Sequence, residues 1–503
     1  MYRIKLVILL LVFFVSTTLE AQKYKKREFR GVWIQTVFQS EYALMSDDEM
    51  KADFISKLDV LSDCGFNALV FQVRSEADAW YESEFEPWSR FCTGLQGKPR
   101  AFDPMSFLIR ECHNRGMEFH AWINPYRAGA SGISPLSQDH IYYKHPDWFV
   151  LYNNKLYFDP GNPQCAKYIC KIVYDIVGRY DIDAIHLDDY FYPYPIKGIP
   201  FPDDKSFELY GKKFGSSAEA RDNWRRDNVN KLVAMLKKTI SSTKKWVRFG
   251  ISPFGIYRNL SSSVVGSLTY GTQNYDDLYA DVLYWTNNKL LDYIVPQIYW
   301  ELDNKAAPYS VLLPWWSKNI KNCQLYIGQD VARTMNVNEL SMKMNMENYF
   351  DNIKGNCFWP ANEVLWNTGG VKDSLKSNYY RYPAIIPAFS NIYDGRPDKV
   401  KKLKYSFDYT KLKLEWLGRG DKKDPRTGRT FVVYRFPFGV ERDFNNPKYI
   451  YKITPFTEID LAIPSGKKDY YYVTSLDRFY NESKYRKIKI RRKKILRKLS
   501  RQR

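Results

Sequence analysis

Over about residues 28 to 365 the sequence alternates eight times between a short apolar segment and a segment long enough for a helix. Each apolar segment is typical of a β-strand and ends in polar and aromatic residues. This alternation predicts a (β/α)8 barrel of the TIM type, with long loops adding to its length. The eight segments are FRGVWIQTV (29–37), FNALVFQVR (66–74), EFHAWINPY (118–126), DAIHLDDYF (183–191), VRFGISPFG (247–255), YIVPQIYW (293–300), QLYIGQDV (324–331) and NCFWPANEVL (356–365). An open doubly wound sheet is disfavoured, because no early strand is followed by a Gly-rich phosphate-binding turn.

Helix signals fall between these strands. The segment DPMSFLIRECHNRG offers an Asp N-cap, a proline at the first helical position and a terminal glycine. KADFISKLDVLSDCG has apolar residues at helical spacing and also ends on glycine. The stretches NPQCAKYICKIVYDIVGRY and DNWRRDNVNKLVAMLKKTI predict two further helices.

The character of the chain changes after Pro383. Short alternating strands separated by polar turns follow, among them KLKLEWLG, RTFVVYRFP and KDYYYVTSLDRFYNES. This pattern predicts a small all-β sandwich, and the YYYVTSLDRFYNES run resembles the last strands of a fibronectin type III module. We therefore expect a barrel over residues 28–385 and a fibronectin type III-like sandwich over residues 390–488, the latter acting as a spacer or binding module.

The first 21 residues have a short basic start, an apolar run from Leu6 to Val15 and small or polar residues up to Ala21. The run is about half the ~20 residues that a membrane-spanning helix needs. It predicts a cleaved signal peptide over residues 1–21, no membrane-spanning helix in the mature chain, and a periplasmic or extracellular location.

The last residues are strongly basic. Residues 484–503 hold 12 Lys and Arg and no acid, which is more than half of the net charge of +20. We expect a basic tail over residues 489–503, because such a block is usually a solvated appendage. It could also tether the protein to an anionic lipid or polymer surface. Nucleic acid is not an expected partner of an exported chain.

The stretch DAIHLDDYFYPYP suggests a catalytic site. Strand alternation places His186 and Asp188 toward the barrel interior and Ile185 and Leu187 toward the helices. Asp188 then points at the mouth of the barrel, where the active sites of this fold lie. Burying a carboxylate that has no partner costs several kcal/mol, on the order of the cost of burying any unpaired charged group. The alternative is a structural ion pair with Arg74 or Arg127.

Other polar and aromatic residues follow the predicted strands at the same end. An aromatic content of 17% suits sugar binding, because sugar faces stack on flat rings, although most single rings belong to cores. The set suits an uncharged or acidic polyhydroxylated ligand and neither a metal nor any other cofactor. The candidate binding residues are Gln72, Arg74, Asn124, Tyr126, Arg127, His186, Tyr190, Ser252, Gln297, Tyr299, Trp300 and Trp359.

Glycoside cleavage needs a carboxylic acid that protonates the leaving oxygen and a second carboxylate that attacks or activates water. Asp188 can be the second group. The first is left open among Asp189, Asp78 and Glu363, with Glu76 and Glu301 as further loop carboxylates. Each of these alone is more often solvated than catalytic.

Several motifs, in this order, resemble the glycosyl hydrolase-like 10 family of exported bacterial proteins: FRGVWIQTV, FQVRSEADAWY, DPMSFLIRECHNRGMEFHAWINPYRA, FDPGNP, IHLDDYFYPYP, FGISPFGIYRN and VPQIYW. The resemblance covers roughly residues 28–365. It implies a (β/α)8 glycoside hydrolase, with a possible action on peptidoglycan strands freed of their peptides. It also implies that Asp188, Asp189, Arg74, Asp78, Asn124, Arg127, Gln297 and Tyr299 line the pocket.

Two other functions remain open from the sequence. A non-catalytic glycan-binding protein would keep the barrel and the aromatic residues without a working carboxylate pair. An enzyme that removes acyl groups from sugars would need a metal-ligand triad or an activated serine, and neither pattern occurs.

Overall fold

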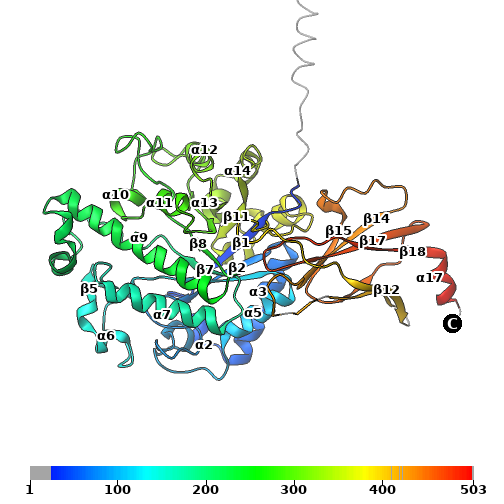
Figure 1. Cartoon of the computed structure of the whole chain (residues 1–503), viewed down its shortest axis with the longest axis horizontal. Coiled ribbons are helices and arrows are strands. Elements are labelled where there is room, and N and C mark those ends of the chain that lie inside the picture. The colour runs from blue at the N-terminus through cyan, green and yellow to red at the C-terminus, as the bar shows by residue number, and fades with distance from the viewer. Residues whose placement is uncertain (1–23, 409–410, 419, 422, 501–503) are drawn as a thin grey trace, which may run out of the picture.

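A computed structural model describes residues 24–408, 411–418, 420–421 and 423–500 of the chain (Figure 1). The predicted signal peptide lies outside these residues. None of the helices in this part of the chain is both long and apolar enough to cross a membrane.

Eight parallel strands close into a barrel in the order β1-β11-β10-β9-β8-β7-β3-β2, which confirms the predicted architecture. The strand β9 has only two residues because the segment continues into Pro296, which has no N–H for a ladder hydrogen bond. The barrel strands are β1 (Phe29–Ile34), β2 (Ala68–Arg74), β3 (Glu118–Ile123), β7 (Ala184–Leu187), β8 (Arg248–Ile251), β9 (Tyr293–Ile294), β10 (Gln324–Asp330) and β11 (Ile353–Trp359).

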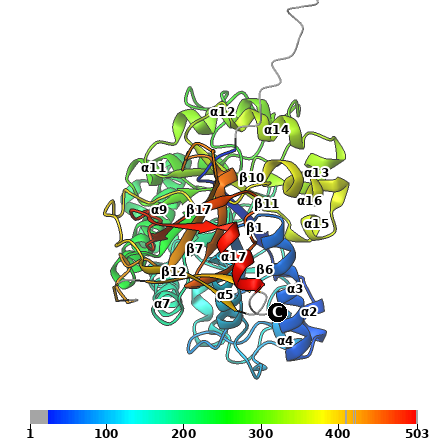
Figure 2. The ribbon, with the colours of Figure 1, turned by 90° about the vertical axis from the view of Figure 1, so that its right-hand side faces the viewer.

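Helices surround the barrel (Figures 1 and 2). In α5 the Asp103 side chain accepts from the Ser106 N–H, Pro104 opens the helix, and Gly116 follows it with φ +72°, as the sequence predicts. The helices of the barrel domain are α2 (Glu41–Leu44), α3 (Asp47–Asp63), α4 (Arg90–Thr93), α5 (Pro104–Asn114), α6 (Ile141–Lys144), α7 (Pro163–Arg179), α8 (Asp204–Ser206), α9 (Ala218–Thr243), α10 (Asn274–Asp277), α11 (Val282–Asn287), α12 (Tyr309–Asn319), α13 (Val331–Asn336), α14 (Leu340–Glu347), α15 (Ala361–Leu365) and α16 (Val371–Ser374).

The two faces of the barrel strands bury different side chains. Ile185 and Leu187 of β7 pack in the large cluster that the strands share with the surrounding helices. The interior is filled by a separate cluster that includes Trp33, Trp122 and Tyr293. This division confirms the predicted alternation along DAIHLDDYF and directs His186 inward.

A small antiparallel sheet interrupts the path from β3 to α7. Its strands are β4 (Arg127–Gly129), β5 (Phe149–Tyr152) and β6 (Lys155–Phe158), in the order β4-β6-β5. None of the strands or helices predicted from the sequence falls in this stretch. The sheet matters because three of its side chains, Arg127, Lys155 and Tyr157, reach the candidate site.

The C-terminal part forms two antiparallel sheets that share a core with Leu414, Trp416 and Tyr471. One sheet contains β12 (Lys401–Asp408), β13 (Lys411–Leu417) and β16 (Glu458–Leu461); the other contains β14 (Thr430–Pro437), β15 (Ile450–Thr454), β17 (Lys468–Leu476) and β18 (Arg486–Arg491). The expected sandwich is therefore present, while its likeness to fibronectin type III stays a prediction.

The basic segment is not a separate appendage over its described part. Strand β18 continues past residue 488, and helix α17 (Arg492–Leu499) follows it directly. The physical reason is the alternation of isoleucine with Lys and Arg, which buries Ile490 in the sandwich core. Ile495 of α17 is buried in the same cluster.

The sandwich covers the end of the barrel at which the strands begin (Figure 2). Arg478 forms an ion pair with Asp181, which lies just before β7. Arg248, the first residue of β8, lies 4.7 Å from the Phe389 ring centroid and 5.7 Å from that of Tyr480. The carboxyl ends of the strands are left open.

Candidate active site

A cavity of about 480 Å³ lies at the carboxyl ends of the barrel strands. This volume is within the range typical of small-ligand sites. Its lining combines two carboxylates, three cations and a wall of aromatic rings: Trp33, Gln35, Val37, Phe38, Gln72, Trp122, Arg127, Lys155, Tyr157, Asp188, Asp189, Tyr190, Tyr194, Ser252, Phe254, Gln297, Tyr299, Trp300, Arg333 and Trp359.

A second cavity of similar size, about 490 Å³, lies between the barrel and the sandwich. Its charged groups already have partners, either one another or, for Asp477, hydrogen-bond donors of its own loop. His113 contacts Asp183 at 2.8 Å, and Arg478 is paired with Asp181. We regard this cavity as part of the domain junction, because its ionic groups hold the two domains together.

Asp188 is buried, with 8% of its surface exposed, and accepts hydrogen bonds from three neutral donors. Its Oδ2 accepts from Asn124 Nδ2 at 3.2 Å, and its Oδ1 accepts from Gln297 Nε2 at 3.3 Å and from the Asp189 N–H at 2.9 Å. No ion pair joins it to a cation within the described residues. The alternative of a structural ion pair with Arg74 or Arg127 is therefore not supported.

The orientation of Asn124 is fixed by its other partners. Its Oδ1 accepts from Gln72 Nε2 at 2.7 Å and from an Arg127 guanidinium N–H at 2.9 Å. The amide nitrogen must then face Asp188, because a side-chain amide has its donor opposite its acceptor. Asn124 and Gln72 thus hold the Asp188 carboxylate in place.

Asp189 lies beside Asp188, and its surroundings favour the protonated form of its carboxyl group. Burial, together with the charge of Asp188 and a hydrogen bond to it, raises the pKa of Asp189 well above its usual value. Tyr194 donates a hydrogen bond to Asp189 Oδ2 and opposes this rise only in part. The pair thus places a carboxyl group that accepts hydrogen bonds beside one whose environment favours its protonated form.

His186 lies below this pair and is neutral. Its Nε2 accepts from Trp33 Nε1 at 3.2 Å, so that its proton is on Nδ1, which faces the Tyr293 hydroxyl at 3.0 Å. Burial lowers the pKa of His186 well below its usual value. His186 is absent from the cavity lining and supports the floor through its contact with Ser252.

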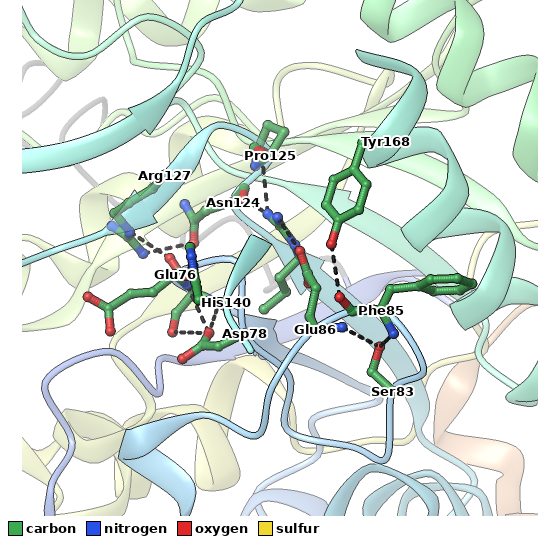
Figure 3. A network of polar contacts seen from close by, with 12 residues as sticks. Glu76, Asp78, Ser83, Phe85, Glu86, Asn124, Pro125, Arg127, His140 and Tyr168 are labelled. Carbon is green, nitrogen blue, oxygen red and sulfur yellow. Dashed lines mark hydrogen bonds and ion pairs between the residues drawn. The ribbon is translucent and has the colours of Figure 1, made fainter. Parts of the chain in front are cut away.

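Another group of carboxylates, Glu76, Asp78 and Glu86, follows β2 (Figure 3). Glu86 forms a two-pronged ion pair with the Arg74 guanidinium at 2.7 and 2.8 Å, and both side chains are fully buried. Glu76 is paired with Arg90 at 2.9 Å. Asp78 Oδ1 accepts from the Glu76 N–H at 2.9 Å and from the Ser75 backbone and hydroxyl.

The structure divides the predicted site residues into two groups. Besides Asp188 and Asp189, the cavity brings together Gln72, Arg127, Tyr190, Ser252, Gln297, Tyr299, Trp300 and Trp359. Outside its lining lie Arg74, Asp78, Asn124, Tyr126, His186 and Glu363, of which Glu363 is hydrogen-bonded to Thr368 at 2.5 Å. Glu76 and Glu301 are not part of the lining either.

Sequence reasoning missed several lining residues. Lys155 and Tyr157 come from β6, and Arg333 comes from α13, directly after β10. The long segment between the third strand and its helix was the available signal for β6. Trp33 and Trp122 could have been found from strand alternation, because both point into the barrel interior.

No group of three or more His, Cys, Asp or Glu side chains in the described part of the chain is placed to hold a metal ion. The lining is one of hydrogen-bonding groups, charges and rings.

The fold and the cavity define a (β/α)8-barrel protein with an acid–carboxylate pair in an aromatic-walled ligand site. A family model described as Glycosyl hydrolase-like 10 matches residues 28–347, and the chain belongs to this family.

Two relatives extend this comparison. The chain is 38% identical over 489 residues to "Glycosyl hydrolase YngK" of Bacillus subtilis (strain 168), covering 94% of this chain and 95% of that protein. It is also 38% identical over 321 residues to "Glycosyl hydrolase DigH" of Escherichia coli (strain K12), covering 59% of this chain and 72% of that protein.

Among solved structures, the catalytic domain of a beta-amylase from Paenibacillus polymyxa aligns with a TM-score of 0.46 at 13% identity, over 71% of this chain and 98% of that chain. A likeness this distant does not bear on function.

Proposed function

We propose that this protein is an exported glycoside hydrolase that cleaves a bacterial glycan built of 2-acetamido sugars, such as peptidoglycan strands freed of their peptides. The observation that carries the proposal is the Asp188–Asp189 pair, which lines a sugar-sized cavity without a neutralising ion pair in the described residues. The names of the relatives support hydrolysis of a glycan, and the predicted signal peptide supports export.

The contact between the two carboxyl groups favours one mechanism. Two carboxyls that flank a glycosidic bond are about 5–9.5 Å apart. Asp189 instead forms a hydrogen bond to Asp188, and no third carboxylate lines the cavity among the described residues. The second group that glycoside cleavage needs must then come from the substrate, as in substrate-assisted glycosidases.

The 2-acetamido group of the sugar supplies the nucleophile in this proposal. Its carbonyl oxygen forms a bond to C1 while the bond from C1 to the leaving oxygen breaks, and Asp189 gives its proton to that oxygen. Asp188 accepts a hydrogen bond from the acetamido N–H and stabilises the positive charge of the cyclic intermediate. Water then attacks C1 while the bond from C1 to the acetamido oxygen breaks, and the water gives a proton to Asp189, so the configuration at C1 is retained.

The walls of the cavity suit the same ligand. Trp122 and Trp359 meet edge to face with ring centroids 6.0 Å apart, and Phe254 and Trp300 meet similarly at 5.3 Å. Flat rings of this kind stack on the apolar faces of sugars. Such walls support glycan binding in general, so a non-catalytic glycan-binding protein is the second candidate.

The test compares the purified protein with Asp189→Asn and Asp78→Asn variants on peptide-free peptidoglycan glycans and a panel of oligosaccharides. Asp78→Asn is the matched control, since Asp78 is buried at the same rim but lies outside the cavity. We expect new reducing ends from the wild type and Asp78→Asn, and their formation by Asp189→Asn to be about 10²–10⁴-fold slower. Binding of a glycan without any product from the wild type would instead support the second candidate.

A further inference from the structure

The sheet face formed by β17 and β18 carries tyrosines and cations side by side. Alternate residues of these strands, including Tyr471 and Ile490, point into the sandwich core, so their neighbours share the outer face. In the strand register these neighbours pair as Lys468 with Arg491, Tyr470 with Lys489 and Tyr472 with Lys487. We call this set, with Arg442, Phe438, Phe444 and Tyr485, the Tyr–Lys face.

The rings of the Tyr–Lys face are held in fixed positions. Tyr485, with 48% of its surface exposed, stacks on Phe444 with centroids 5.2 Å apart and meets Tyr472 edge to face at 4.9 Å. Phe438 is 53% exposed. The Arg442 guanidinium lies 4.8 Å from the Tyr470 ring centroid. Tyr472 is itself buried, so Tyr485 and Phe438 are the exposed rings of this face, and Tyr470 is half-buried beside them.

The cations of the Tyr–Lys face lack acidic partners. Within the described residues no ion pair involves Arg442, Lys468, Lys487, Lys489 or Arg491. Glu441 and Asp443 flank Arg442 in sequence, and Asp469 points inward to Arg435 at 2.8 Å. A hydrogen bond from Lys468, with the charges of Lys468, Lys489 and Arg442, lowers the pKa of Tyr470, which agrees with a net positive potential there.

The basic surface continues past the edge of the sheet. Lys399, Lys401 and Lys402 line a shallow hollow together with Arg486, the first residue of β18. Along β18 itself, Lys487, Lys489 and Arg491 recur on one face about every 7 Å. This end of the molecule, with β18 and α17, projects away from the barrel (Figure 1). It presents a row of positive charges to a long, repeating ligand.

An anionic lipid surface and an anionic polysaccharide both have the required charge. The environment of α17 distinguishes between them. A helix that inserts into a membrane surface needs a free apolar face. The apolar side of α17 is turned inward, because Ile495 is fully buried in the sandwich core and Leu499 packs against it, which leaves only Leu496 substantially exposed at 44%. A lipid surface would meet the charges without an inserting anchor, whereas sugar rings would also meet the exposed tyrosine and phenylalanine rings.

We propose that the Tyr–Lys face is a binding site for an anionic polysaccharide, whose acidic groups pair with Lys487 and Lys489 and whose sugar rings stack on Tyr485 and Tyr470. The site is separate from the cavity of the barrel and holds the enzyme on a polymer independently of hydrolysis.

The test measures binding of the purified protein to polygalacturonate, to neutral dextran, to linear polyphosphate and to vesicles of anionic phosphatidylglycerol in phosphatidylcholine. We expect the tightest binding to polygalacturonate, weakened by salt. The Lys487→Ser/Lys489→Ser double variant should bind it about tenfold more weakly, as expected for the loss of two exposed ion pairs. The matched control is Lys167→Ser/Lys238→Ser, two exposed lysines on barrel helices without a recorded ion pair.

The aromatic part has its own test. Tyr485→Ala should weaken binding to polygalacturonate and leave binding to polyphosphate unchanged. Tyr174→Ala, at a tyrosine of α7 that is even more exposed, should change neither. The proposal is overturned if vesicles or polyphosphate bind as tightly as polygalacturonate, if Tyr485→Ala has no effect, or if no polymer binds. Circular dichroism of each variant checks that the sandwich is folded.

Discussion

Two carboxylate clusters lie at the same rim of the barrel, and they differ in how their charges are balanced. After β2, Glu86 and Glu76 are each paired with an arginine, and Asp78 accepts hydrogen bonds from the Ser75 and Glu76 N–H groups through Oδ1. After β7, Asp188 has only neutral donors among the described residues, and the environment of Asp189 favours its protonated form. Buried acids that are paired or hydrogen-bonded within their own loop stabilise it, whereas acids that face a cavity without a cationic partner are available for chemistry.

The largest expected effect comes from removing Asp189, the acid of the pair that follows β7. Asp189→Asn should lower kcat on a cleavable glycan by about 10²–10⁴-fold, because the leaving oxygen loses its proton donor. Thermal unfolding should change little, because the asparagine removes only a neutral acid. Turnover close to that of the wild type would mean that another group supplies the proton.

Breaking the ion pair between Arg74 and Glu86, which follows β2, should lower the stability of the fold. Glu86→Gln leaves the buried Arg74 guanidinium without a charged partner, and we expect the free energy of unfolding to fall by about 3–5 kcal/mol. Urea denaturation measures this loss. Glu84→Gln, an exposed neighbour, is the control and should change stability little. A stability equal to the wild type would contradict the structural role of the pair.

Replacing Asp78, which accepts hydrogen bonds from the backbone of its own loop, should cause a smaller loss of stability. Asp78→Ala should cost about 1–3 kcal/mol, since the Ser75 and Glu76 N–H groups lose their acceptor. Asp78→Asn retains an acceptor oxygen and should recover most of this. If instead Asp78→Asn abolished turnover in a folded protein, the two clusters would not be separated as described.

The smallest effect concerns the pH dependence of the acid. Asp189 acts while protonated, so activity should be lost as pH rises through its raised pKa. Tyr194 lowers this pKa by stabilising the ionised form, and Tyr194→Phe should therefore move the alkaline limb of the kcat profile to higher pH. Tyr126→Phe is the control, because the buried Tyr126 hydroxyl has no hydrogen-bond partner among the residues that the structure describes. A shift to lower pH would contradict the assignment of Asp189 as the acid.

The sequence predicted the barrel well because the strands repeat a strong local pattern. Alternation in DAIHLDDYF was enough to place Ile185 and Leu187 outward and Asp188 at the mouth. The same pattern also predicted Arg74 and Asp78 as pocket residues, because they lie at the end of β2. Arg74 instead pairs with Glu86, and Asp78 accepts hydrogen bonds from its own loop. A local sequence pattern cannot predict which acid will form an ion pair with an arginine, because the partner of Arg74 is Glu86, 12 residues further along the chain.

Two other features depend on tertiary contacts. Lys155 and Tyr157 enter the site because β6 folds back over the barrel, and nothing in their immediate sequence marks them as ligand-binding. The basic segment after residue 484 belongs to the sandwich because Ile490 and Ile495 have a core to enter. Charge counting alone predicted an appendage.

The most direct test of the central claim compares two oligosaccharides that differ only in whether the 2-amino groups are acetylated, with kcat/KM measured for each. If the substrate's acetamido oxygen attacks C1 beside Asp188, the acetylated form is cleaved with retention of configuration and the deacetylated form is not cleaved. A stable thiazoline analogue of the cyclic intermediate should also compete with the substrate. Equal cleavage of both forms, or inversion at C1, would contradict the account.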